Sequence, residues 1–162
     1  MALTVAFWIL AVIGVMAALA VVLLGNVFRS ALSLVLCFLA VAGIYITLSA
    51  DFLAAVQVLV YVGAISVLII LAIMLTRDVH KGSPGNKFRV PAFIVAALFL
   101  GGVIYAMVNT GWAVSSTPPL EPTTPTIANL LFSKGGFILP LEIAPLLLVA
   151  AIIGAIVLVR EK

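Results

Sequence analysis

The residues best suited to chemistry in this chain lie together in one long apolar segment. Gln57, Tyr61, Gly63 and Ser66 provide an amide, a phenol, an unsubstituted backbone and a hydroxyl within a run over about residues 52–75. At 1.5 Å per residue a helix of this length crosses the hydrocarbon core of a bilayer, and Tyr61 falls near the middle. Polar groups at that depth serve either helix packing or a path for water and ions, and the residues alone leave both interpretations open.

Acidic and basic side chains are almost absent from the apolar runs. None of the runs contains lysine, arginine or histidine, and the one acid inside a run is Glu142. Glu142 is interpreted either as a proton or ion contact at a channel mouth or as a first-turn acid that the helix dipole stabilises. The chain also lacks a glycine-rich phosphate loop, a cysteine cluster, a histidine pair and a nucleophile–base set. We therefore expect no catalytic residue, no cofactor site and no metal site on this chain.

The composition predicts an integral membrane protein made of helices. Of the 162 residues, 66% are hydrophobic and only 8% are charged, which a soluble domain of this length could not bury in one core. The apolar runs lack the alternation of a membrane β-barrel, so helices must satisfy the backbone. The net charge of +3 comes from residues at the ends of the runs, which indicates membrane orientation rather than nucleic-acid binding.

Five apolar runs predict five transmembrane helices in a single membrane domain, 1–162. We expect these helices at about residues 2–24, 30–48, 52–75, 91–110 and 140–159. Asp51 is predicted to be the N-cap of the third helix. A charged loop at 76–90 joins the third and fourth helices, and a longer proline-rich loop at 111–137 joins the fourth and fifth. Within that loop, 127–132 is predicted to form a short interfacial helix that Gly135 and Gly136 end.

The basic residues predict the orientation of the chain in the membrane. With five crossings, only Lys134 lies on one side, and the other side holds seven basic residues: Arg29, Arg77, Lys81, Lys87, Arg89, Arg160 and Lys162. Because loops rich in lysine and arginine remain in the cytoplasm, we expect the N-terminus outside and the C-terminus in the cytoplasm or its organellar equivalent.

The polar groups of the third helix have different positions in different helix registers. In an α-helix Gln57 and Tyr61 share a face, and Ala54 and Ala64 allow a neighbouring helix to approach closely. Ser66 then lies about 140° away from Tyr61. A π-bulge near Gly63 would turn the following residues back by about 100° and bring Ser66 towards that face. The alternative is an ordinary α-helix whose Gln57 and Tyr61 pack against a partner helix.

Two stretches of the chain resemble a known family. The segment Gln57 to Leu75, with its Tyr61-Val-Gly63-Ala-Ile-Ser66 core, resembles the third-helix signature of subunit J of proton-pumping NADH:quinone oxidoreductase, the counterpart of mitochondrial NADH dehydrogenase subunit 6. The segment Leu139 to Leu158 resembles the last-helix signature of the same family. Five runs in the same order extend the resemblance over nearly the whole chain.

The resemblance implies a non-catalytic membrane-arm subunit of respiratory complex I. Its partners would be the other membrane-arm subunits, including the quinone-module and antiporter-like subunits, within the lipid bilayer. The complex would use NADH or another donor, FMN, iron–sulfur clusters and a quinone, none of them bound by this chain. In the family the third helix carries a π-bulge around the motif that is here Tyr61 to Gly63. Its conversion between α and π is linked to opening a water path, and the loop from Arg77 to Arg89 would face the peripheral arm.

The sequence departs from the family pattern at three places. Gln57 stands where many relatives have a carboxylate, so no proton-carrying acid is expected there. Leu141 replaces the usual phenylalanine, and Pro145 replaces a usual serine and is expected to loosen the first turn of the last helix. The motif Gly63-Ala-Ile-Ser66-Val also resembles photosynthetic and archaeal branches of the family, which leaves the electron donor open.

Two other classes of function compete with the complex I interpretation. Similar helices occur in Mrp-type cation/proton antiporters and in membrane-bound hydrogenases, where no NADH is oxidised. A non-catalytic membrane scaffold is the third class. For the complex I class we expect a multi-pass protein of a bacterial or archaeal plasma membrane, with the membrane of an energy-converting organelle as the alternative.

Overall fold

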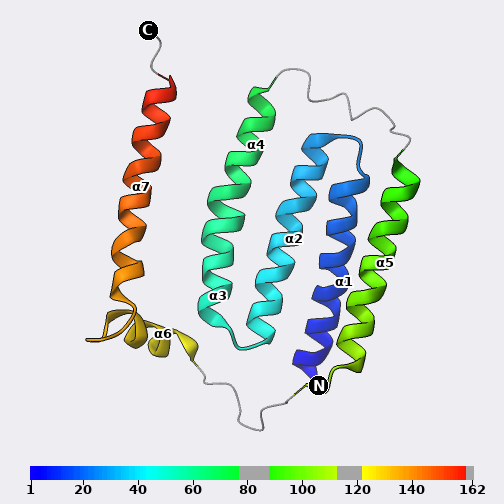
Figure 1. Cartoon of the computed structure of the whole chain (residues 1–162), viewed down its shortest axis with the longest axis horizontal. Helices are drawn as coiled ribbons and strands as arrows, with labels where there is room; N and C mark the ends of the chain where they lie inside the picture. Colours follow the sequence, from blue (N-terminus) through cyan, green and yellow to red (C-terminus); the bar gives the residue numbers. More distant parts are fainter. Residues whose placement is uncertain (77–87, 113–121, 160–162) are drawn as a thin grey trace.

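The computed structural model describes residues 1–76, 88–112 and 122–159, and every element in these ranges is a helix (Figure 1). In chain order they are α1 (Ala2–Leu23), α2 (Val27–Thr47), α3 (Asp51–Val56), the π-helix η1 (Gln57–Ile65), α4 (Ser66–Leu75), α5 (Arg89–Asn109), α6 (Thr123–Phe132) and α7 (Ile138–Val159).

Five helices in the described residues are long and apolar enough to cross a membrane. They are α1, α2, α5, α7 and the 25-residue helix Asp51–Leu75 that α3, η1 and α4 form together. The prediction of an all-helical protein with five spans is therefore confirmed. Most of the predicted charged loop (77–87), part of the proline-rich loop (113–121) and the basic C-terminal residues (160–162) lie outside the described residues.

Three helices begin earlier than the sequence suggested. The second helix starts at Val27 rather than near residue 30, because the Asn26 side chain accepts a hydrogen bond from the Arg29 N–H at 3.2 Å and caps the helix. Helices α5 and α7 start two residues before Pro91 and Pro140. Proline is accommodated there because the first-turn N–H groups of a helix have no intrahelical acceptor.

The turn between α2 and α3 corrects the prediction for Asp51. The N-cap of the third helix is Ala50, with no side-chain capping bond, and Asp51 is the first residue inside the helix. Ser49 adopts a left-handed φ of 58°, and the Ala50 N–H donates to the Tyr45 carbonyl at 2.9 Å, which closes the end of α2. Asp51 still lies in the first turn, where a carboxylate stabilises the helix dipole.

Small side chains hold α1, α2 and the Asp51–Leu75 helix together. The buried apolar side chains in the described residues are all alanines: Ala17, Ala31, Ala40, Ala42 and Ala54. Two glycines extend the pattern, because a Cβ added to Gly14 would lie 3.5 Å from the Cβ of Ala40, and one added to Gly43 would meet Leu10. Without a hydrophobic driving force in lipid, such close backbone approach is what stabilises helix pairs.

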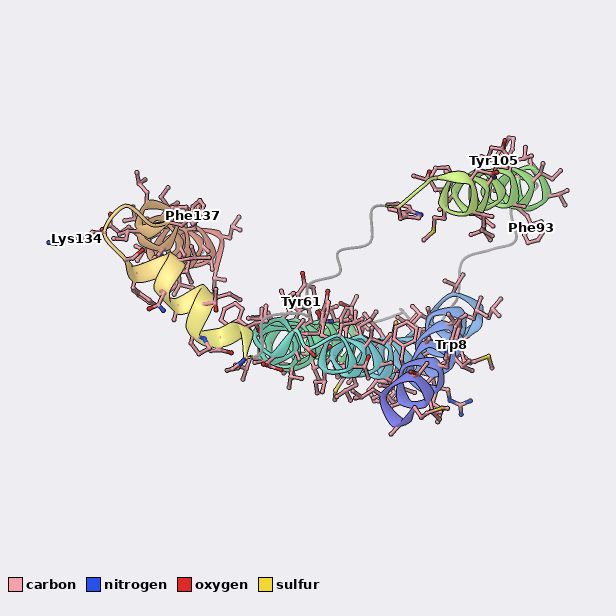
Figure 2. All side chains as sticks on the ribbon, turned by 90° about the horizontal axis from the view of Figure 1, so that it is seen from below. Trp8, Tyr61, Phe93, Tyr105, Lys134 and Phe137 are labelled. Atoms are coloured by element: carbon pink, nitrogen blue, oxygen red, sulfur yellow. The ribbon has the colours of Figure 1, made fainter. Side chains whose placement is uncertain are left out.

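Helices α5 and α7 stand apart from this layer. Seen end-on, both lie on the same side of α1, α2 and the Asp51–Leu75 helix, with open space between them (Figure 2). Neither helix has a buried residue among the side chains that the structure describes, which are Val90–Asn109 of α5 and the whole of α7. Long apolar helices with so much exposed surface suit contact with lipid or with further membrane helices.

The short helix predicted at 127–132 is present but longer, spanning Thr123–Phe132 as α6, since prolines 122 and 125 fit its start. It ends at Phe132 with Ser133 as its C-cap, before the predicted glycine pair. In the turn that follows, Gly135 has a φ of +87° and the Phe137 N–H donates to the Leu130 carbonyl at 2.9 Å. Pro145 lies inside α7, beyond the first turn rather than within it, because α7 begins at Ile138. The carbonyl left without an N–H donor is that of Leu141, four residues back and in the first turn, so the loosening of that turn stays a prediction.

Candidate functional site

The middle of the third membrane span is a π-helix of nine residues, Gln57–Ile65. At its end the Ser66 N–H donates to the Tyr61 carbonyl, five residues back, instead of the residue four back that an α-helix would use. Gly63 lies inside the segment, and a Cβ there would be 3.4 Å from the Val58 carbonyl oxygen, also five residues back. The predicted departure from α geometry near Gly63 is present and longer than a single inserted residue.

The wide turn brings Gln57 and Ser66 to the same side of the helix. Both are buried, at 7% and 2% exposure, on a helix whose middle and far half pack against α2. Nine steps of about 100° would put the two residues on opposite sides of an α-helix. The π segment thus places an amide and a hydroxyl together at a helix contact in the membrane interior.

Tyr61 lies at the edge of this contact. Its ring meets Phe38 of α2 edge-on, with the ring centroids 5.5 Å apart and the planes at 70°, and its side chain is 43% exposed. The side chain points from the helix towards the open side on which α5 and α7 lie (Figure 2). The sequence predicted one face shared by Gln57 and Tyr61; in the structure Gln57 is buried, and Tyr61 contacts Phe38 of α2 but is half-exposed.

The Ser66 hydroxyl bonds to the same carbonyl as the Ser66 backbone N–H, that of Tyr61. Its Oγ–H donates to the Tyr61 carbonyl at 2.7 Å, so this oxygen accepts both the amide and the hydroxyl of Ser66. In the α-helices, Ser33 and Thr76 hydroxyls donate to carbonyls four residues back, at 3.0 and 2.7 Å. A serine hydroxyl is therefore satisfied in either register, and Ser66 marks where the π segment returns to α geometry.

The Gln57 side chain is the buried polar side chain of the π segment itself. No hydrogen bond joins it to another residue in the described part of the chain, although it is over nine-tenths buried. Its amide atoms are not among the fully buried polar atoms that lack a partner, which in the described residues comprise Thr123 Oγ1 alone, so they remain within reach of water. Within the described residues no cluster of histidine, cysteine, aspartate or glutamate could hold a metal.

The amino-acid sequence of this chain is similar to those of known proteins over most of its length. The family described as NADH-ubiquinone/plastoquinone oxidoreductase chain 6 matches residues 17–158. The chain belongs to this family. It is 40% identical to F(420)H(2) dehydrogenase subunit J of Methanosarcina mazei, over 98% of this chain and 92% of that protein. It is 43% and 44% identical to the NAD(P)H-quinone oxidoreductase chain 6 of Leptolyngbya boryana and of Synechocystis sp., over 98% and 97% of this chain and 80% of each relative.

These chain 6 relatives come from an archaeon and from cyanobacteria, the branches that the Gly63-Ala-Ile-Ser66-Val motif resembles. The site lies on the Asp51–Leu75 helix where this helix contacts α2. Gln57 and Ser66 are buried there, and Tyr61 lies at the edge. Glu142 is not part of it: it lies exposed on α7, a helix with no buried residue.

Phe38 is the site residue that sequence reasoning missed in this chain 6 protein. The signal was available, because α2 and the Asp51–Leu75 helix are antiparallel neighbours joined by a short turn. Phe38 lies ten residues before Leu48, and Tyr61 lies ten residues after Asp51. Residues at equal distances from a tight turn lie side by side, so an aromatic partner for Tyr61 could have been inferred.

Proposed function

We propose that this chain is a membrane-arm subunit of a complex I-type quinone oxidoreductase that couples quinone reduction to proton translocation through its third helix. The observation that carries the proposal is the π-helix at mid-membrane, with Tyr61 half-exposed at its edge. The chain contributes no catalytic residue. The electron donor, FMN, iron–sulfur clusters and quinone would be bound by other subunits, and the donor is NADH, NAD(P)H or F420H2 according to the enzyme.

The coupling role follows from the two registers open to this helix. Removing one residue from the π segment turns everything beyond it by about 100°. Such a turn would move Ser66 and Tyr61 relative to Gln57 and change which polar groups line the contact with α2. A path for water through the membrane interior then opens in one register and closes in the other, without any ionisable group on this helix.

The exposed helices α5 and α7 supply the surfaces for partner subunits. Both are apolar, their described side chains are not buried, and they lie on the side towards which Tyr61 points (Figure 2). Quinone-module and antiporter-like subunits that fill this side would bring their own proton-carrying groups next to Tyr61 and the π segment. The Gln57 amide, which bonds to no other described residue, provides a site where a water molecule of that path could bind.

The basic residues support one orientation of this assembly. With the N-terminus outside and the C-terminus in the cytoplasm, the connection between α4 and α5 lies on the cytoplasmic side, where electrons from a soluble donor arrive. The proposed location is a bacterial or archaeal plasma membrane or the equivalent membrane of an energy-converting organelle.

The coupling role is tested with Tyr61→Phe and Gly63→Leu in the assembled enzyme. Both variants are expected to lower quinone reduction that is coupled to proton uptake, because the first removes the hydroxyl that faces the partner side and the second adds bulk to the π segment. Tyr105→Phe on exposed α5 is the matched control and should behave as wild type. Unchanged turnover and pumping in both test variants would refute the coupling role.

The assembly itself is tested by copurification in mild detergent followed by identification of the partners. Quinone-module and antiporter-like subunits are expected. Hydrogenase or Mrp subunits in their place would assign the chain to a related ion-translocating assembly, and purification without partners would indicate a scaffold.

A further inference from the structure

An open cavity of about 450 Å³ lies where the ends of several helices meet. Its described lining comprises Leu3, Ile46, Ser49, Asp51 and Pro122. These residues belong to the first turn of α1, the last turn of α2, the turn that follows it, the start of α3 and the N-cap of α6. Segments far apart in the sequence thus form one cavity, and its volume falls in the range of about 300–1,000 Å³ that is typical of ligand sites.

The cavity lies at the level of a membrane boundary. Each of its lining residues is at a helix end or within one turn of it, and α1, α2 and the Asp51–Leu75 helix are three of the candidate membrane spans. The start of α1, the turn between α2 and α3, and α6 are all at the same end of the molecule (Figure 1). Helix α6 contacts α3 there. Lipid headgroups occupy this level of a bilayer, so they are the ligands that the cavity meets first.

The lining combines apolar side chains with electrostatic groups of both signs. Leu3 and Ile46 are 65% and 62% exposed and offer apolar surface to an acyl chain. The exposed Asp51 carboxylate provides negative charge, and no ion pair or side-chain hydrogen bond joins it to another residue in the described part of the chain. Helices α3 and α6 both begin here without a side-chain cap, so their first-turn N–H groups provide partial positive charge.

A zwitterionic headgroup matches this lining better than a simple anion or cation. Its ammonium would bind the Asp51 carboxylate, and its phosphate would accept hydrogen bonds from N–H groups at the helix starts. A headgroup that carries only negative charge would be repelled by Asp51, and a free cation would be repelled by the helix starts. A primary ammonium also donates hydrogen bonds to a carboxylate, which a quaternary ammonium cannot do.

We propose that this cavity binds a phospholipid whose headgroup carries a primary ammonium, and that Asp51 is the residue that selects this headgroup. The acyl chains of the lipid lie along Leu3 and Ile46 and continue into the bilayer. The bound lipid joins the start of α1, the turn between α2 and α3, and α6 at one boundary of the membrane. Because the cavity is at a membrane boundary and the π segment is at mid-membrane, the proposal is independent of the coupling role.

Photolabelling of the assembled enzyme in nanodiscs tests the proposal. The probes are phosphatidylethanolamine and phosphatidylglycerol that carry the same diazirine on an acyl chain, close to the glycerol, and the labelled peptides are identified by mass spectrometry. In the wild type we expect phosphatidylethanolamine to label the peptides that contain Leu3 and Ile46 at least about threefold more than phosphatidylglycerol does, as an exposed ion pair predicts. Phosphatidylcholine, with its quaternary ammonium, should also label them less than phosphatidylethanolamine.

Two substitutions separate the charge of the cavity from its space. Asp51→Asn should bring the ratio of the two labels close to one, whereas Asp51→Glu should retain the preference because the carboxylate stays. Ile46→Trp fills the cavity with a side chain that suits a membrane boundary, so it should lower labelling near Leu3 by both lipids. Glu142→Gln is the matched control, because Glu142 is also an exposed acid near the start of a span at this end of the molecule but does not line the cavity (Figure 1).

Equal labelling by the two lipids in the wild type, or a preference that persists in Asp51→Asn, would overturn the proposal. Labelling that Ile46→Trp leaves unchanged would do the same, as would a single-particle map in which a side chain of another subunit fills the cavity. If Asp51→Asn fails to assemble, the comparison of phosphatidylethanolamine with phosphatidylcholine in the wild type decides whether the ammonium is recognised. Labelling is read without measuring turnover, so its outcome does not depend on whether the third helix couples quinone reduction to proton translocation.

Discussion

Replacing Gly43 with alanine should weaken the contact between α1 and α2, even though alanine favours helices. A Cβ at Gly43 would lie 2.8 and 3.0 Å from the two δ-carbons of Leu10. These distances are well inside the 3.5–4.0 Å at which carbon atoms attract. Leu10 would have to leave its rotamer or move, at a cost of about 0.5–1.5 kcal/mol, and it would also lose contacts on its other side.

Gly14 provides a control within the same interface. A Cβ at Gly14 would lie 3.5 Å from the Cβ of Ala40, which is an ordinary contact. Both substitutions gain the same helix propensity, at most about 1 kcal/mol, so the difference between the two variants isolates the clash. We expect Gly43→Ala to be less stable than Gly14→Ala by about 1–2 kcal/mol.

The assay is reversible unfolding of the chain in mixed micelles, with the free energy of unfolding determined for each variant. Leu10→Ala should cost stability in the wild-type background but much less in the Gly43→Ala background, because the new methyl fills the space that the leucine leaves. The coupling energy of this double-mutant cycle should be about 1 kcal/mol. Equal stabilities for Gly43→Ala and Gly14→Ala, or no coupling to Leu10, would refute the assignment of this contact.

Three further predictions follow from the described contacts. Glu142→Gln should be tolerated better than Tyr61→Phe, because Glu142 lies apart from the π segment; loss of pumping by an assembled Glu142→Gln enzyme would contradict this. Ser66→Ala should keep the π register in single-particle maps, because it preserves size and loses only the hydroxyl bond to Tyr61, worth about 0.5–1.5 kcal/mol. Gly136→Ala should lower the amount of assembled subunit on immunoblots, because its methyl would collide with the Leu130 carbonyl, whereas Gly101→Ala, with open space around it, should not.

The sequence predicted the five spans because an apolar run has only one stable solution in a bilayer, a helix with its own backbone bonds. The ends of helices were harder to predict, because they depend on single local bonds. Asn26 extends α2 by capping it, and the left-handed Ser49 moves the start of α3 past the position that Asp51 was expected to cap. The Asn26 cap and the left-handed Ser49 leave no periodic pattern in the sequence from which either could be predicted.

The site was predictable in its residues but only partly in its geometry. Glycine and polar groups at mid-span indicated a break from α geometry near Gly63, and a π-helix is present there. Its length was not predictable, because it depends on how α2 packs against the helix. The same dependence on packing decides that Ser66 is buried while Tyr61 stays half-exposed.

The electron donor in the name differs from one relative of this chain to another. Relatives named for F(420)H(2) and for NAD(P)H are 40% and 43–44% identical to this chain over nearly its whole length. Near their centre the described spans hold the Gln57 amide, the Tyr61 phenol, the Ser66 hydroxyl and the Cys37 thiol. The proposed switch of register would respond to packing at α2 and to the subunits on the open side, whichever donor supplies the electrons. One π-helix of this design can therefore serve enzymes that differ in their source of electrons.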